Sequence, residues 1–301
     1  MANSDLGEKM VGAGEAKLYI ATSKNEIAAS LYPLIQRNLE ESFAKSSQSS
    51  FYIAFSGGSL PALLSGLPDF LADANVDPHW QNWHVILADE RLVSSTDPDS
   101  NLGSLKTCLL DQIPIPENQI FGIDENFLSP DSDEDANKIA EEYQERVFGN
   151  VDLSSRKYLL DCVLLGFGPD GHTASLFPNH PLLNENDLLV AGIIDSPKPP
   201  PKRITLTMKV LNELSKNVIF VGAGGSKAPI LQNIFDRVQL ISEDSSDNSN
   251  NAKKCVAIMK KSQKYPCGMI RPQSGSLVYL TDADGAADLD LTQNCLPCSL
   301  L

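Results

Sequence analysis

The sequence predicts an α/β fold: a mainly parallel, doubly wound (Rossmann-like) sheet with helices on both faces. Short apolar runs alternate with segments of helical spacing through most of the 301 residues. The run over residues 159–165 is apolar except for Asp161, which is typical of a strand covered on both faces. Several runs end in glycine or charged residues. We therefore expect their carboxyl ends to share one edge, where ligands bind in open α/β sheets.

The first part of the chain predicts a strand, a helix, a second strand and a second helix. Residues 17–22 (KLYIAT) form the expected first strand. Apolar side chains recur at helical spacing over residues 25–44, and Pro33 either kinks this helix or marks its true start. Residues 51–55 (FYIAF) are the next strand. A proline then suits the first turn of a helix over residues 61–71.

A Gly-Gly-Ser turn joins this strand to the helix that follows. The bare backbone N–H groups of Gly57, Gly58 and Ser59 are suited to hold an anion such as phosphate. The turn fits neither the P-loop pattern nor the dinucleotide pattern of spaced glycines. On its own it is a weak indication of a phosphate site.

Charged residues follow the next expected strand, residues 84–88. Asp89, Glu90 and Arg91 would stand at its carboxyl end, where ligands sit. The alternative is a solvated turn with a local ion pair. The loop beyond contains Asn101.

The strongest site candidate follows the strand over residues 159–165. Glycines there, Gly168 among them, permit positive φ and close approach of the backbone. A short helix over residues 172–175 would place His172 at its start. Histidine can accept and donate a proton near neutral pH. The alternative is an ordinary turn with a surface histidine.

A basic, proline-rich segment, SPKPPPKR, spans residues 196–203. Three successive prolines favour a stiff, extended backbone. The side chains of Lys198, Lys202 and Arg203 would therefore be kept in place. In a chain this acidic, the cluster is the best local anion site. The alternative is a basic surface linker.

The remaining spacing completes the pattern. We expect strands over residues 188–194, 204–207, 217–221, 255–259 and 277–281, and helices over 104–110, 136–148, 208–214 and 226–238. The strand over 217–221 ends in glycines, with Lys227 beyond them. Residues 242–251 are polar and of low complexity, which predicts a mobile loop.

The chain divides into a flexible lead-in over residues 1–16, one α/β domain over 17–285 and a tail over 286–301. The last four residues, CSLL, fit the C-a-a-X prenylation pattern with terminal Leu, or match it by chance. The pattern predicts a geranylgeranyl group on Cys298 and weak membrane association.

Composition limits the function classes. The net charge is −15, which argues against a nucleic-acid surface and gives an anionic substrate no global steering. The six cysteines are scattered and no secretory signal precedes them, so we expect free thiols in a reducing compartment. A lone C-x-x-C at residues 295–298 makes a metal site or redox pair improbable. No apolar run is long enough to span a bilayer.

Six segments together resemble the 6-phosphogluconolactonase family, part of the glucosamine-6-phosphate isomerase/6-phosphogluconolactonase family, over residues 17–282. They are SGGSLP (56–61), ADER (88–91), SNLGSL (100–105), LLGFGPDGHTASLFP (164–178), PPPKRITLT (199–207) and VGAGGSKA (221–228). The resemblance implies hydrolysis of 6-phospho-D-glucono-1,5-lactone to 6-phosphogluconate, the second step of the oxidative pentose phosphate pathway. It also implies no metal or organic cofactor, and a fold similar to glucosamine-6-phosphate deaminase and ribose-5-phosphate isomerase. We expect a cytoplasmic monomer or small homo-oligomer.

The resemblance and the chemistry of the residues suggest roles. His172 is the expected general base and then acid, and Asp170 would orient it or the attacking water. Backbone N–H groups of the glycine turns, including Gly168, would stabilise the oxyanion. The expected phosphate or substrate contacts are Gly57, Gly58, Ser59, Arg91, Lys202, Arg203 and, more weakly, Lys227. Asp89, Glu90 and Asn101 would bind sugar hydroxyls.

Two other functions compete with the lactonase. A deaminase or isomerase relative would need residues for ring opening and amine chemistry, and the segment GPDGHTASLFP favours the lactonase instead. A phosphosugar-binding regulator would carry a DNA-binding module, for which this sequence has no basic helix-turn-helix segment. Of the other histidines, His79 and His84 are expected to be structural, and His180 is a weaker candidate for substrate contact.

Overall fold

The computed structural model describes residues 14–44, 46–128, 134–149, 157–242, 252–261 and 263–292. Within them, the main sheet consists of β1 (Glu15–Ala21), β2 (Phe51–Phe55), β3 (Trp83–Leu87), β5 (Leu160–Gly166), β8 (Ser215–Val221), β9 (Phe235–Ser242), β10 (Lys253–Met259), β11 (Leu277–Asp282) and β12 (Leu291–Thr292). Their order is β12-β9-β10-β1-β11-β8-β5-β2-β3. Every pairing is parallel except those of β10 with β1 and β9. The predicted mainly parallel α/β fold is confirmed.

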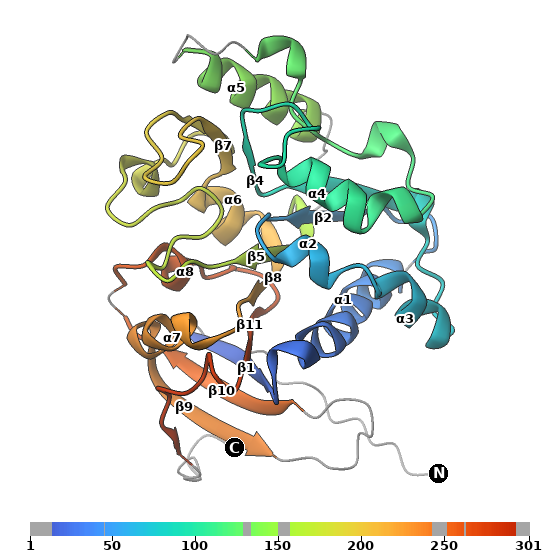
Figure 1. Cartoon of the computed structure of the whole chain (residues 1–301). Helices are drawn as coiled ribbons and strands as arrows, with labels where there is room; N and C mark the ends of the chain where they lie inside the picture. The colour runs from blue at the N-terminus through green and yellow to red at the C-terminus, as the bar shows by residue number, and fades with distance from the viewer. Residues whose placement is uncertain are drawn as a thin grey trace.

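Helices cover both faces of the main sheet. Figure 1 shows α1 (Ile27–Phe43) and α3 (Leu67–Asp73) on one side and α7 (Ala228–Ile234) on the other. The core-facing side of α1 carries Leu31 and Ile35, both fully buried, as the helical spacing predicts. Pro33 lies inside this helix rather than at its start.

A second, smaller sheet was not foreseen as a separate unit. It consists of β4 (Asp89–Arg91), β7 (Arg203–Leu206) and β6 (Val190–Ile193), all antiparallel. The helix α5 (Glu134–Phe148) packs against β6 and β7 (Figure 1). The residues Asp89, Glu90 and Arg91 are therefore a strand, not a turn after one.

Three predicted helices need correction. The helix over 61–71 is two helices, α2 (Leu60–Leu63) and α3, separated at Gly66. The helix over 226–238 ends at Ile234, and β9 follows without a loop. No helix forms over residues 172–175, because the chain turns sharply at Ala174 with φ of +47°.

Two other predicted helices agree with the expected spacing within a few residues, α4 (Asn101–Cys108) and α6 (Met208–Glu213). The short helix α8 (Pro266–Met269) was not predicted, and neither were the 3-10 turns at Lys24–Glu26, Trp80–Asn82, Leu110–Gln112, Glu117–Gln119, Glu125–Phe127, Pro181–Asn184 and Gly225–Lys227. In the segment expected to be a tail, β12 pairs with β9. Most of the predicted loop over 242–251 lies outside the described residues. Among the helices that are described, none is long and apolar enough to cross a membrane.

Candidate active site

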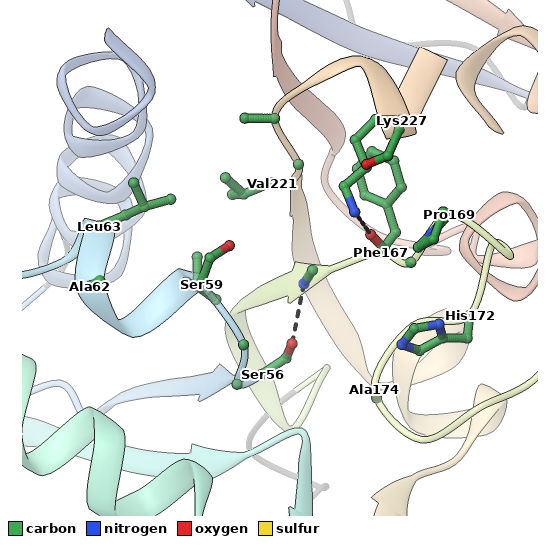
Figure 2. A pocket seen from close by; sticks show the side chains of 18 of the residues that line it. Ser56, Ser59, Ala62, Leu63, Phe167, Pro169, His172, Ala174, Val221 and Lys227 are labelled. Carbon is green, nitrogen blue, oxygen red and sulfur yellow. Dashed lines mark hydrogen bonds between the residues drawn. The ribbon is translucent and has the colours of Figure 1, made fainter. Parts of the chain in front are cut away.

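A cavity of about 560 Å³ lies at the carboxyl ends of β2, β5 and β8. Its walls include the turn after β2, the glycine loop after β5, the glycine turn after β8, and side chains of β4 and β7. The predicted shared edge is therefore where the cavity is found. Figure 2 shows Ser59 and Leu63 on one side of the cavity, facing His172 and Lys227 on the other.

Most of the residues predicted from the sequence meet at this cavity. Those that line it are Gly57, Gly58, Ser59, Asp89, Arg91, Gly168, His172, Arg203 and Lys227. Four others, Glu90, Asn101, Asp170 and Lys202, stand outside the lining. Glu90, Asn101 and Asp170 each contact a residue that does line it.

His172 is held by Asp170 from the same loop. Its Nδ1 lies 2.5 Å from Asp170 Oδ1, and its ring stacks on Phe177 with centroids 5.1 Å apart. Burial lowers the pKa of His172 below its ordinary value, Asp170 opposes this shift, and the charge of Lys198 adds to it. A histidine in this state is neutral near pH 7 and can accept a proton.

Lys198 is a third member of this group. Its Nζ lies 3.1 Å from Asp170 Oδ2 and 3.0 Å from His172 Nδ1. Partial burial works to raise the pKa of Asp170, but hydrogen bonds and charges from His172 and Lys198 outweigh it and lower that pKa to about 2. The carboxylate is thus ionised at every working pH.

These contacts select one tautomer of His172. Its Nδ1 cannot both donate to Asp170 and accept from Lys198. The contact with Asp170 is the shorter, and Lys198 already has the carboxylate as a partner. The consistent assignment places the proton on Nδ1. Nε2, which has no partner among the described residues, is then the lone-pair atom.

Two arginines lie opposite each other on β4 and β7. Arg91 and Arg203 are cross-strand partners, and both line the cavity. Arg203 donates to the backbone oxygens of Lys198, Pro199 and Pro200. Burial, and secondly the charge of Arg91, lowers the pKa of Arg203. The Nε of Arg91 is buried without a hydrogen-bond partner in the described part of the chain.

Ser175 connects Asp89 to Arg203 beneath the cavity. Its Oγ donates to Asp89 Oδ2 at 2.8 Å and accepts from Arg203 Nη1 at 3.4 Å. Ser175 is fully buried and Asp89 is 4% exposed. No sequence pattern singled out Ser175, because a serine in a turn shows no periodicity.

The side chains of Glu90 and Asn101 make hydrogen bonds within the protein interior. The Glu90 carboxylate accepts from the backbone N–H groups of Arg91, Asn101 and Leu102 and from the Ser100 hydroxyl, which fixes the start of α4. The Asn101 amide donates to the Asp89 carbonyl at 2.7 Å. Both side chains are buried and neither lines the cavity.

The glycine turns differ in which N–H groups they leave unused. Gly168, Gly222 and Gly224 donate to His172, Leu280 and Asp282. The N–H groups of Gly57, Gly58 and Ser59 donate to no described residue. Gly58 has φ of +71°, so glycine allows this turn at no steric cost. The turn after β2 is therefore the one whose backbone N–H groups can bind a ligand in the cavity.

Of the four cations that the sequence predicted as contacts, Arg91, Arg203 and Lys227 line the cavity and Lys202 does not. Lys227 donates to the Phe167 carbonyl at 2.6 Å, and burial lowers its pKa (Figure 2). Lys202 contributes its backbone carbonyl to Leu92 and does not line the cavity. The segment that carries Lys198 and Arg203 bends rather than extends, because the N–H of Ser196 bonds back to the Pro201 carbonyl.

The other histidines are not part of the cavity lining. His84 stacks on Tyr52, and the His79 ring packs at a tilt against Phe43, as expected for structural residues. His180 pairs with Asp195. Of the described cysteines, Cys108, Cys162, Cys255 and Cys267 are free. In the described ranges, no three or more His, Cys, Asp or Glu side chains gather closely enough to hold a metal ion.

Comparisons with known proteins agree with one another. The chain matches the family model described as glucosamine-6-phosphate isomerases/6-phosphogluconolactonase over residues 22–279. It is 33% identical over 279 residues to 6-phosphogluconolactonase of Rattus norvegicus, covering 92% of this chain and 95% of the relative. It is 40% identical over 224 residues to 6-phosphogluconolactonase 3 of Saccharomyces cerevisiae, covering 72% and 84%. The solved 6-phosphogluconolactonase from Trypanosoma brucei shares the fold, with a TM-score of 0.71 at 24% identity over 91% of this chain and 99% of that one.

Proposed function

The chain belongs to the glucosamine-6-phosphate isomerase/6-phosphogluconolactonase family, and we propose that it hydrolyses 6-phospho-D-glucono-1,5-lactone to 6-phospho-D-gluconate, the second step of the oxidative pentose phosphate pathway. One observation carries the assignment to this site. A neutral histidine, oriented by an ionised carboxylate, borders a cavity that also holds two arginines.

His172 supplies the proton transfers. Its Nε2 takes a proton from water as the water oxygen bonds to the lactone carbonyl carbon, which leaves an oxyanion and an imidazolium. The oxyanion collapses, the bond from that carbon to the ring oxygen breaks, and the imidazolium returns its proton to the ring oxygen. The product is the open-chain acid, which then ionises. Asp170 keeps Nδ1–H in place and stabilises the imidazolium.

Arg91 and Arg203 bind the phosphate. Two guanidinium groups on opposing strand positions repel each other unless an anion lies between them. The orphaned Nε of Arg91 supports this role, since a phosphate oxygen would satisfy it. We assign the contact to Arg203 rather than to Lys202, which is outside the cavity lining.

The turn after β2 supplies the oxyanion donors. The N–H groups of Gly57, Gly58 and Ser59 have no described acceptor and border the cavity. Asp89 is the carboxylate of β4 that reaches the cavity, so it would bind sugar hydroxyls. Glu90 and Asn101 would act indirectly, by holding β4 and α4 together.

The test is consumption of freshly made 6-phosphogluconolactone, measured against its spontaneous hydrolysis. We expect His172→Ala to lose most of kcat with an unchanged circular dichroism spectrum, roughly 100-fold or more. Arg203→Ala should mainly raise KM, because the phosphate is remote from the reacting carbon. A folded wild-type protein without acceleration would refute the function, and an active His172→Ala would refute only the mechanism.

The family name also covers isomerases that act on glucosamine 6-phosphate. Release of ammonia from glucosamine 6-phosphate by the wild-type protein would assign the chain to that branch. We expect none.

Three further expectations stay predictions. A cytoplasmic location and a monomer or small oligomer can be tested by fractionation and light scattering. A prenyl group on Cys298 concerns a residue outside the described part of the chain. Mass spectrometry of the C-terminal peptide from the native source would find the added lipid or its absence.

A further inference from the structure

We propose that Lys198 is a positioning residue that keeps His172 neutral and its Nε2 free to accept a proton. The proposal rests on the base role given above to His172. It assigns a function to the proline-rich loop between β6 and β7, which the mechanism otherwise leaves unexplained.

The backbone of this loop is fixed from two sides. Ser196 Oγ donates to the Lys198 carbonyl at 2.8 Å and accepts from its N–H at 3.2 Å. Arg203 Nη2 donates to the same carbonyl at 2.9 Å. These hydrogen bonds fix the backbone of Lys198 beside His172. The side chain therefore starts from a fixed point, although a lysine side chain normally samples many rotamers.

The side chain of Lys198 then reaches the far oxygen of Asp170. His172 contacts Oδ1 at 2.5 Å, while Lys198 lies 3.1 Å from Oδ2 and 3.3 Å from Oδ1. The cation thus holds the carboxylate in the orientation that receives Nδ1–H.

The charge of Lys198 acts on the histidine directly. The ammonium nitrogen is 3.0 Å from Nδ1, so protonation of the ring would bring two positive charges into contact. Other charges near the ring come from Asp170 in its own loop and Asp89 of β4, and both favour the protonated form. Lys227, beyond β8, faces Asp170. Burial is the first cause of the lowered pKa of His172, and the charge of Lys198 adds to it by offsetting part of the effect of the two carboxylates.

Nuclear magnetic resonance of ¹⁵N-labelled histidine tests this without any substrate. Spectra of wild type, Lys198→Met and Lys198→Arg are titrated with acid, and His172 is assigned from its missing signal in His172→Gln. We expect the wild-type ring to carry its proton on Nδ1. The pKa of His172 should rise in Lys198→Met and stay near the wild-type value in Lys198→Arg, which keeps the charge. Lys198→Gln is the second neutral variant if Lys198→Met does not fold.

Two lactones separate positioning from phosphate binding. Lys198→Met should lower kcat/KM by the same factor, up to about 100-fold, for 6-phosphogluconolactone and for unphosphorylated glucono-1,5-lactone. A loss confined to the phosphorylated lactone would make Lys198 a phosphate contact and overturn the proposal. An unchanged His172 pKa in Lys198→Met, or a wild-type proton on Nε2, would also overturn it. Because the titrations need no turnover, a wild type inactive on both lactones would refute the proposed function while leaving this test intact.

Discussion

Gly57→Ala should destabilise the protein through its neighbour Asn101. A methyl group on Gly57 would lie 1.7 Å from Asn101 Oδ1 and 2.3 Å from its Cγ, which no packing tolerates. Asn101 is 3% exposed. It must turn away and give up its 2.7 Å hydrogen bond to the Asp89 carbonyl.

The size of the effect follows from that lost bond. A buried carbonyl and amide left unpaired cost about 1 to 3 kcal/mol. For a chain of this length, that corresponds to a fall in Tm of roughly 2 to 5 °C. Thermal unfolding followed by circular dichroism, with urea unfolding for the free energy, measures both quantities.

A double-mutant cycle makes the reasoning refutable. In an Asn101→Ala background the obstacle is gone, so Gly57→Ala should change the free energy of unfolding by less than about 0.5 kcal/mol. Gly58→Ala is the matched control. It has φ of +71° and no atom within 4 Å, so it should cost about 1 kcal/mol in either background. If Gly57→Ala cost the same in both backgrounds, the collision with Asn101 would not be the cause.

Three other predictions concern single groups. Because burial lowers the pKa of His172, the rising limb of kcat/KM against pH should lie below about 6.5, and activity should fall as acid protonates the ring; a limb above that value contradicts this. Ser175→Ala should lower the free energy of unfolding in urea by about 1 to 3 kcal/mol and raise KM, since it disconnects Asp89 from Arg203; an unchanged KM would mean that the bridge does not order the site. Burial raises the pKa of Cys267 to about 12, so a thiol reagent should label it in guanidinium but not in the native protein, and labelling in both would show local opening.

The sequence predicted those parts of the fold in which apolar residues follow a single regular pattern over a long segment. The helix α1 spans 17 residues with apolar positions four apart, and β5 is apolar except for Asp161. The strand β4 has only three residues, too few to show alternation. The strand β9 follows α7 with no glycine or proline between them, so its apolar residues read as a continued helix.

The candidate site was predicted in its residue types more than in its contacts. The glycine loop identified His172 and Asp170, which indeed touch. The expected helix start at His172 was wrong, because Ala174 takes a left-handed conformation that alanine rarely adopts. Of three cations in one segment, composition could not tell that Lys198 and Arg203 turn inward while Lys202 does not. That depends on bends set by the Ser196 hydrogen bond, which no spacing reveals.

The small sheet places Arg91 and Arg203 on facing positions of neighbouring strands, although 111 residues of chain lie between them. Two like charges on these positions weaken the pairing of β4 with β7. An anion that bridges both would remove this repulsion, so inorganic phosphate should raise the melting temperature. Replacing Arg91 and Arg203 with neutral residues should give a more stable protein that binds a phosphorylated substrate less well. If a phosphate bridges the two arginines as proposed, the substrate-free molecule is less stable than its architecture allows, and each phosphorylated substrate restores the difference for as long as it is bound.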